Sequence, residues 1–324
     1  MADVILPLIG PDALSPEWKE IRRFSKDRPG LPCVFGATDA AACCGMSPYK
    51  TPLDVFVQKM YGTEVEENEA MRMGKRLEPI ILDEYEQRRC VTLRRNLPMF
   101  FHGKYRWIGA TPDGIAVGGE QRLVDPVFGG WKYGVDAKSS TYRRYDKDDT
   151  DEMKFGQEDT DHMPVDYVMQ GTQQCAVLNL PYVEFPVLFD ARTMRIYRVE
   201  RNEDLIGLII HAEKEMLERL QNNDPPEPNW THENTRELIG ILFGHKEDVV
   251  KQLDAEWADQ WLKVQRWKEG IKEREAWIEE VNNKILYHLA GATAGIFPSG
   301  NEQIKRIVVK ESKVTQKDVD DLRE

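Results

Sequence analysis

Two acidic residues on adjacent predicted strands constrain the fold of this chain more than any other feature of its sequence. Residues 106–110 are typical of a strand that runs into a turn at 111–114, this turn contains Asp113, and residues 115–117 continue in extended form. Residues 133–137 are typical of a second strand, which carries Asp136. Neighbouring strands bring the two carboxylates close enough to converge on one cation. The pattern therefore predicts a sheet with an acidic site between two of its strands.

Lys138 adds chemistry to this acidic pair. It follows Asp136 by two residues, so both side chains lie on one face of an extended strand. Two carboxylates hold a hard cation such as Mg²⁺ through oxygen. The lysine can then reach a water that attacks a phosphodiester and stabilise the charge that develops there. Each part alone is unspecific, because Pro-Asp-Gly is typical of a simple turn and an acid-x-Lys tripeptide occurs by chance in charged proteins.

A third acid, Glu78, lies in a predicted helix over residues 69–89. Its apolar positions step by four, three, four and four residues, and they are Ala70, Gly74, Leu77, Ile81 and Tyr85. Glu78 lies on the stripe that faces the core, where an isolated charge needs a cation or hydrogen-bond partners. Pro79 directly after it predicts a kink. The alternative is a carboxylate at the rim, paired with Arg76 or Lys75.

Several further blocks occur along the chain in a definite order. They are residues 18–22, 35–41, 45–52, 71–79, 110–114, 136–138 and 167–170. Their order and spacing resemble the lambda-exonuclease-like, or YqaJ-type, viral recombination exonucleases of the PD-(D/E)XK nuclease superfamily. The resemblance extends from about Trp18 to Trp230. It implies an α/β fold with a restriction-endonuclease-like core, a central mixed sheet flanked by helices, followed here by a C-terminal helical extension.

The resemblance implies a metal site of known composition. Asp113 and Asp136 would bind Mg²⁺, with the backbone carbonyl of Ala137 as a third ligand, and Mn²⁺ would substitute. Lys138 would orient or activate the attacking water. Asp136 stands where a glutamate is commoner in the family, a shorter acid that the superfamily pattern allows.

The resemblance also assigns residues around that site. Glu78 and Gln170 would support a second metal or the water, although Gly-Thr follows Gln170 where a second glutamine is usual. Arg22 matches an arginine that binds the 5′-terminal phosphate of DNA, and Thr38 stands in place of a phosphate-contacting serine. The alternative for Arg22 is a pair with Glu20 or a helix cap.

The net charge of −12 opposes a protein that binds nucleic acid over its whole surface. The cations are clustered, however, at Arg22, Arg23, Lys26 and Arg28, at Arg72, Lys75 and Arg76, and at Arg94 and Arg95. These clusters predict a positive cleft in an acidic body, or else ordinary solvated helix faces.

Composition indicates a folded cytoplasmic protein. A hydrophobic content of 41% is enough for a core in 324 residues, and no run of eighteen apolar residues or signal-peptide pattern occurs. We expect no membrane association and a location in the cytoplasm of a bacterial or phage-infected cell. The five cysteines lack Cys-x-x-Cys spacing, so we expect reduced thiols and neither a zinc site nor an iron–sulfur cluster.

Two domains are expected, an exonuclease domain over residues 1–230 and a helical, possibly coiled-coil, extension over 231–324 with a short β-like tail. Turn-forming residues at 222–230 indicate the boundary. A helical pattern runs over residues 245–289, and its apolar stripe would form an arm or pack on the core. The acidic segment 142–161 is expected to be a long surface loop.

The expected function is a Mg²⁺-dependent DNA exonuclease that degrades the 5′-ended strand of duplex ends and leaves 3′ overhangs for recombination by strand annealing. The resemblance alone implies this polarity, a ring-shaped homo-oligomer such as a trimer, and a single-strand annealing protein as partner. Two alternatives stay open. One is an endonuclease with the same metal site, and the other is a non-catalytic scaffold that binds DNA ends, which would have no need for an inward-facing acid cluster.

Overall fold

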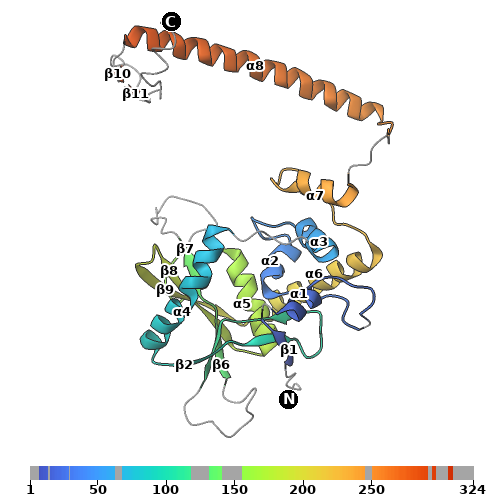
Figure 1. Ribbon diagram of the computed structural model, residues 1–324, viewed down its shortest axis with the longest axis vertical. Helices are drawn as coiled ribbons and strands as arrows, with labels where there is room; N and C mark the ends of the chain where they lie inside the picture. Colours follow the sequence, from blue (N-terminus) through green and yellow to red (C-terminus); the bar gives the residue numbers. More distant parts are fainter. Residues whose placement is uncertain are drawn as a thin grey trace, which may run out of the picture. The chain divides into compact units, whose positions relative to one another are not determined.

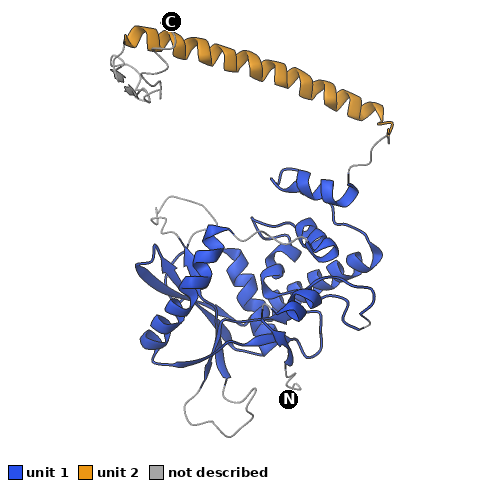
Figure 2. Cartoon of the chain, viewed as in Figure 1, with its two compact units in different colours: residues 1–245 blue, residues 246–324 orange. Residues whose placement is uncertain are grey.

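The computed structural model describes residues 7–13, 15–28, 30–62, 68–117, 131–140, 155–244, 250–290, 294–296 and 306–308. The chain divides into two compact units, residues 1–245 and residues 246–324 (Figure 2). Within the described part of the chain, no helix combines the length and the apolar character that a membrane crossing requires.

The first unit combines strands and helices. Its strands are β1 (Leu8–Asp12), β2 (Thr92–Arg95), β3 (Pro98–Phe101), β4 (Gly109–Ala110), β5 (Gly114–Val117), β6 (Trp131–Val135), β7 (Lys138–Ser140), β8 (Tyr182–Phe189) and β9 (Thr193–Glu200). Its helices are α1 (Pro16–Arg22), the 3₁₀ turn η1 (Ala37–Asp39), α2 (Ala40–Cys43), α3 (Pro52–Tyr61), α4 (Glu69–Arg89), α5 (Val165–Leu178), α6 (Glu203–Asn222) and α7 (Thr235–Phe243).

Local signals define the ends of α4. The side chain of Asn68 accepts a hydrogen bond from the Met71 N–H at 2.9 Å and so caps the N-terminus. Cys90 takes a left-handed conformation and ends the helix. The helix continues through Pro79, whose nitrogen cannot donate the backbone bond that other residues make there. The sequence-based prediction of one helix over residues 69–89 is confirmed.

The main sheet is mixed. Its order is β2-β5-β6-β8, with β9 also on β8, and β7 pairs with β8 beyond the end of β6. Strands β5 and β6 are neighbours, as the sequence predicts, and they run antiparallel, whereas β6 and β7 both run parallel to β8. Strands β6 and β7 are therefore two parts of one line, interrupted at residues 136 and 137. The parallel return from β7 to β8 contains α5, as a crossover requires.

Helices α4 and α5 cover opposite faces of this sheet (Figure 1). Alternate residues of β8 show the division, because side chains in a strand point to alternating faces. Phe185 and Val187 pack in the cluster that contains Cys175 of α5, whereas Leu188 packs in the cluster that contains Tyr85 of α4. These faces confirm a central mixed sheet flanked by helices.

A second layer forms beside the sheet. Strands β1, β3 and β4 make a small antiparallel sheet, in which β4 is shorter than the strand expected over residues 106–110. Helices α3, α6 and α7 meet in one apolar cluster, which includes Phe56, Leu220 and Leu238. Because α7 belongs to this cluster, the first unit extends to residue 245, whereas the sequence places the boundary at 230.

The second unit contains the long helix α8 (Ala255–Leu289) and the strand pair β10 (Ala294–Ile296) and β11 (Arg306–Val308). Helix α8 begins at Ala255, later than the helix expected from residue 245, and Asp254 is its N-cap residue. None of its residues is buried. The expectation that its apolar stripe forms an arm or packs on the core stays a prediction. Of the acidic segment 142–161, which is expected to form a surface loop, residues 142–154 lie outside the described residues.

We predict that truncation after Gly244 leaves the melting temperature of the first unit unchanged, whereas truncation after Trp230 lowers it. The shorter chain lacks α7, so it exposes the cluster around Leu238, which keeps only 7% of its surface exposed. Losing one buried leucine costs roughly 2–5 kcal/mol. Calorimetry on the two truncated chains and the full-length protein measures the difference. Equal melting temperatures for both truncations would contradict the assignment of α7 to the first unit.

Candidate active site

The interruption between β6 and β7 creates the acidic site. The Asp136 N–H donates to the Glu184 carbonyl at 3.0 Å, as a parallel ladder requires. The next bond of that ladder would run from the N–H of residue 186 to the Asp136 carbonyl, but Pro186 has no N–H. The ladder therefore stops at Asp136, and residues 136 and 137 leave the regular strand.

Asp113 reaches this interruption from the neighbouring strand. It directly precedes β5, and the register pairs Gly114 with Val135. The Ala137 N–H donates to Asp113 Oδ2 at 2.8 Å. The structure thus brings Asp113 and Asp136 together across adjacent antiparallel strands, as the sequence predicts.

Two glutamines of α5 hold Asp136 from the other side. Gln170 Nε2 and Gln174 Nε2 both donate to Asp136 Oδ2, at 2.7 and 2.6 Å. The Asp136 side chain is 2% exposed, so these donors replace the water that a carboxylate would otherwise need. Sequence reasoning found Gln170 but missed Gln174. The signal was present, because residues four apart lie on one face of a helix.

Lys138 points to the same face of the sheet as Asp136. Its ammonium forms an ion pair with Asp136 Oδ1 and lies 5.2 Å from the centre of the Tyr167 ring. Burial by itself lowers the pKa of Lys138, but the attraction of Asp136 and then Asp113 outweighs it and raises that pKa above its usual range. Lys138 is therefore a cation in this arrangement, suited to donating hydrogen bonds and stabilising negative charge.

Glu78 approaches from α4. The helix crosses close to β7 here, since a Cβ on Gly74 would lie 3.9 Å from Ser139 Oγ. Glu78 is half-buried, and burial followed by repulsion from Asp136 raises its pKa, with Lys138 opposing the shift. The pKa of Glu78 therefore depends on the charges of Asp136 and Lys138. This coupling suits the role that the resemblance implies, in which Glu78 supports a second metal or the attacking water.

The donor set fits a hard divalent cation. Burial and the nearby Asp136 raise the pKa of Asp113 well above its ordinary value, a tension that a cation between the two acids would relieve. Among the described residues, no three His, Cys, Asp or Glu side chains form a closed cluster. Two carboxylates, the Ala137 carbonyl and water are the ligands that Mg²⁺ ordinarily takes. The protein would supply only part of the coordination shell.

Arg22 lies in a separate arrangement beside η1. Its Nη2 forms an ion pair with Asp39 Oδ2 at 3.2 Å, and its guanidinium carbon lies 4.6 Å from the centre of the Trp18 ring. The partner is therefore Asp39, where the sequence offered Glu20. Thr38, in η1, is exposed. Helix α5 links this region to the acidic site, since Gln173 Nε2 donates to the Phe35 carbonyl at 3.2 Å just before η1.

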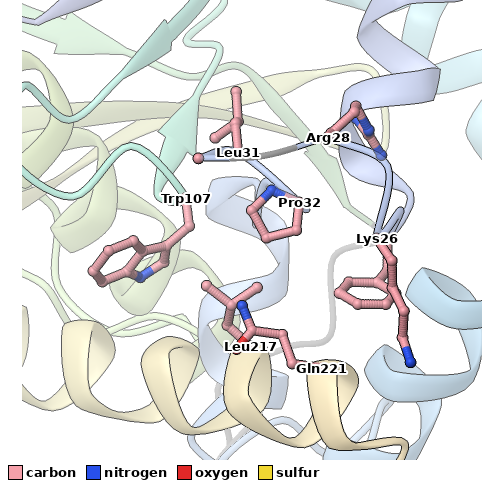
Figure 3. Close-up of a pocket in the computed structure, with 9 residues that line it drawn as sticks. Lys26, Arg28, Leu31, Pro32, Trp107, Leu217 and Gln221 are labelled. Atoms are coloured by element: carbon pink, nitrogen blue, oxygen red, sulfur yellow. The ribbon is translucent and has the colours of Figure 1, made fainter.

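A pocket of about 500 Å³ lies between the segment after α1 and helix α6. Figure 3 shows Pro32 between Trp107 at one end and Lys26 at the other, with Leu217 below. Arg28 also lines it and donates to the Arg23 carbonyl. Part of the predicted basic cluster thus borders a hollow with aromatic and apolar walls, apart from the acidic pair.

The fold and the site together define a class: a mixed α/β domain in which two acids from neighbouring strands and a lysine meet where one strand is interrupted. A model of the YqaJ-like viral recombinase domain matches residues 17–180, just over half of the chain, and the chain belongs to this family. The matched region includes every predicted site residue.

Individual relatives are distant. The uncharacterized protein YqaJ of Bacillus subtilis (strain 168) is 24% identical over 277 residues, covering 83% of this chain and 78% of that protein. Among solved structures, the chain is similar to the alkaline exonuclease LHK-Exo from Laribacter hongkongensis, with 18% identity, a TM-score of 0.42, and coverage of 59% of this chain and 89% of that one. A phage related exonuclease from Haemophilus somnus 129PT gives 13% identity, a TM-score of 0.42, and coverage of 59% and 96%.

We predict that Asp113→Asn makes the metal-free protein more stable than the parent at pH 8 but not at pH 4. The folded state raises the pKa of Asp113, so the folded protein binds this proton more tightly than the unfolded chain. The resulting stability is present at low pH and is lost as pH rises through the raised pKa. Asparagine never ionises and avoids the loss.

Thermal melting with chelator from pH 4 to pH 8 measures this difference. The control is Glu218→Gln, which removes an exposed acid of α6. Parallel melting curves for Asp113→Asn and the parent over the whole pH range would contradict the placement of Asp113 beside a second acid.

Proposed function

We propose that this protein is a Mg²⁺-dependent DNA exonuclease that degrades the 5′-ended strand of duplex ends and leaves 3′ overhangs. The observation that carries the proposal is the convergence of Asp113, Asp136 and Lys138 at the interruption between β6 and β7. Two acids that can hold a cation, with a lysine beside them, suit phosphodiester hydrolysis. The family's description as a viral recombinase domain supports DNA as the substrate.

Each side chain has a defined task in this proposal. Asp113, Asp136 and the Ala137 carbonyl would hold Mg²⁺ or Mn²⁺, which would supply Lewis-acid chemistry to the phosphate and the attacking water. Gln170 and Gln174 keep Asp136 in one orientation by donating to Oδ2. Lys138 would orient or activate the attacking water and stabilise charge that develops on the phosphate. Glu78 supports this arrangement from α4.

Strand polarity, oligomeric state and partner complete the proposal. A 5′ direction accords with Arg22, whose guanidinium can make two parallel charge-assisted bonds to a terminal phosphate. A closed ring of subunits would keep the enzyme on its duplex, and a single-strand annealing protein would receive the 3′ overhang. A cytoplasmic location follows from a DNA substrate in a bacterial or phage-infected cell.

Digestion of duplexes labelled at the 5′ or the 3′ end, with Mg²⁺ and with chelator, tests activity, metal and direction together. We expect early release of the 5′ label as mononucleotides in Mg²⁺ only. Covalently closed plasmid serves as the matched substrate, because an exonuclease leaves it intact. Nicking of the closed plasmid would favour an endonuclease, and intact substrates throughout would favour a non-catalytic scaffold.

We predict that Lys138→Met lowers the cleavage rate by on the order of 10²-fold or more while DNA binding is kept, since this cation acts on charge that develops during the reaction. Asp113→Ala and Asp136→Ala should abolish cleavage. Lys132→Met is the matched control, because Lys132 is an exposed lysine of β6. Single-turnover kinetics at saturating protein give the rates. Normal turnover by Lys138→Met would make the acid-x-Lys match a coincidence.

We predict that Gln174→Met lowers the single-turnover rate by about tenfold, because a hydrogen bond to a charged group contributes roughly 1.5–3 kcal/mol. Methionine has a similar size but cannot donate to Asp136. Gln221→Met, an exposed change on α6, is the control. An unchanged rate in Gln174→Met would show that Gln170 alone positions Asp136.

A further inference from the structure

A buried cluster of charges surrounds Arg22 at the junction of α1, η1 and α3. Asp39 Oδ2 accepts from Arg22 Nη2 at 3.2 Å, from Lys59 Nζ at 2.7 Å and from the Gly36 N–H at 3.0 Å. Lys59 also donates to the Val34 carbonyl at 3.0 Å. The side chains of Asp39 and Lys59 are 1% and 3% exposed, whereas Arg22 keeps 20% of its surface. Only the arginine of this cluster is therefore within reach of a ligand.

The charges of this cluster do not cancel. Burial alone would raise the pKa of Asp39, but Lys59 and then Arg22 outweigh it and hold that pKa well below its usual range, so Asp39 is ionised. Glu213 is also close and fully buried, and burial followed by repulsion from Asp39 raises its pKa well above the ordinary value. The ion-paired trio of Arg22, Lys59 and Asp39 itself contains two cations and one anion, which leaves one positive charge. A buried Lys59 is thus what prevents Asp39 from neutralising Arg22.

The surrounding residues also define the direction of the Arg22 guanidinium. It lies 4.6 Å from the Trp18 ring centre on one side, where a cation is attracted to the face of an indole. On another side it lies against Gly36, where an added Cβ would come within 3.1 Å of the guanidinium carbon. The arginine is therefore preorganised, which lowers the entropy lost when it binds an anion.

We propose that Asp39 and Lys59 act as a positioning pair for Arg22: Asp39 directs the guanidinium, and Lys59 cancels the charge of Asp39 so that Arg22 presents its full charge to a terminal phosphate of DNA. This inference rests on the proposed function. A merely structural pair would join α1, η1 and α3 and would affect folding alone.

Four full-length variants separate these roles by charge. Lys59→Met leaves Asp39 to neutralise Arg22, so the cluster loses its net charge. Asp39→Asn raises the net charge, and the double variant Asp39→Asn/Lys59→Met restores the parent's value without a buried ion. Lys214→Met, which removes an exposed cation of α6, controls for overall charge.

The measurement is equilibrium binding of 5′-phosphorylated and 5′-hydroxyl duplexes, dye-labelled at the 3′ end, in chelator so that no cleavage occurs. We expect the parent, the Lys214 variant and the double variant to prefer the phosphorylated duplex, and Lys59→Met to lose about tenfold of that preference, as expected for one charge-assisted bond. The 5′-hydroxyl affinity should stay equal in all of them. Asp39→Asn should keep the preference, because the asparagine oxygen can still accept the hydrogen bond that directs the guanidinium.

Three outcomes would overturn the inference. They are an unchanged preference in Lys59→Met, an equal loss in the double variant, and a parent without any preference. If Lys59→Met fails to fold, as melting would show, the double variant and Asp39→Asn still decide the matter, because a loss of preference in either one contradicts a charge role. If the parent cleaves labelled ends but has no preference for the 5′-phosphorylated duplex, only this inference is rejected. If the parent has that preference but does not cleave, only the proposed function is rejected.

Discussion

The interruption of one strand at Asp136 is the constraint on which the rest of the site depends. A continuous β6–β7 strand would direct every backbone group of residues 136 and 137 into the sheet. Pro186 removes the donor that would continue the ladder, and Gln170 and Gln174 replace water at the Asp136 carboxylate. The Ala137 N–H is then available to Asp113 at 2.8 Å. A proline and two amides thus convert a regular strand into a place where two acids meet.

The local charge at the acidic site and around Arg22 is the second constraint on the structure. Burial, followed by repulsion from Asp136, raises the pKa of Asp113 well above its usual value, and Lys138 offsets only part of this shift. Near Arg22 the balance is reversed, with two cations around Asp39. A cation suits the first site and an anion the second. Within a protein of net charge −12, the two sites thus differ in the sign of their local charge.

Comparison of particular residues shows how far sequence patterns reach. The helix over 69–89 was predictable because its apolar period and Asn68 cap are local. The pairing of the two acid-bearing strands was also predictable, since turn residues and extended runs are short-range signals. The partner of Arg22 was not, because Asp39 lies seventeen residues away and only the packing of η1 against α1 selects it over Glu20. The domain boundary moved for the same reason, as α7 is retained by tertiary contacts with α3 and α6.

The sequence by itself determined the residue types of the acidic site, the strand and helix that carry them, and membership of the family through residues 17–180. These properties depend on short-range periodicity and on the order of motifs along the chain. Only the tertiary structure decided that Gln174 joins Gln170 on Asp136, that Pro186 ends the ladder there, and that Lys59 competes with Arg22 for Asp39. Each of these contacts joins segments far apart in sequence. Their geometry arises from packing, which no local pattern encodes.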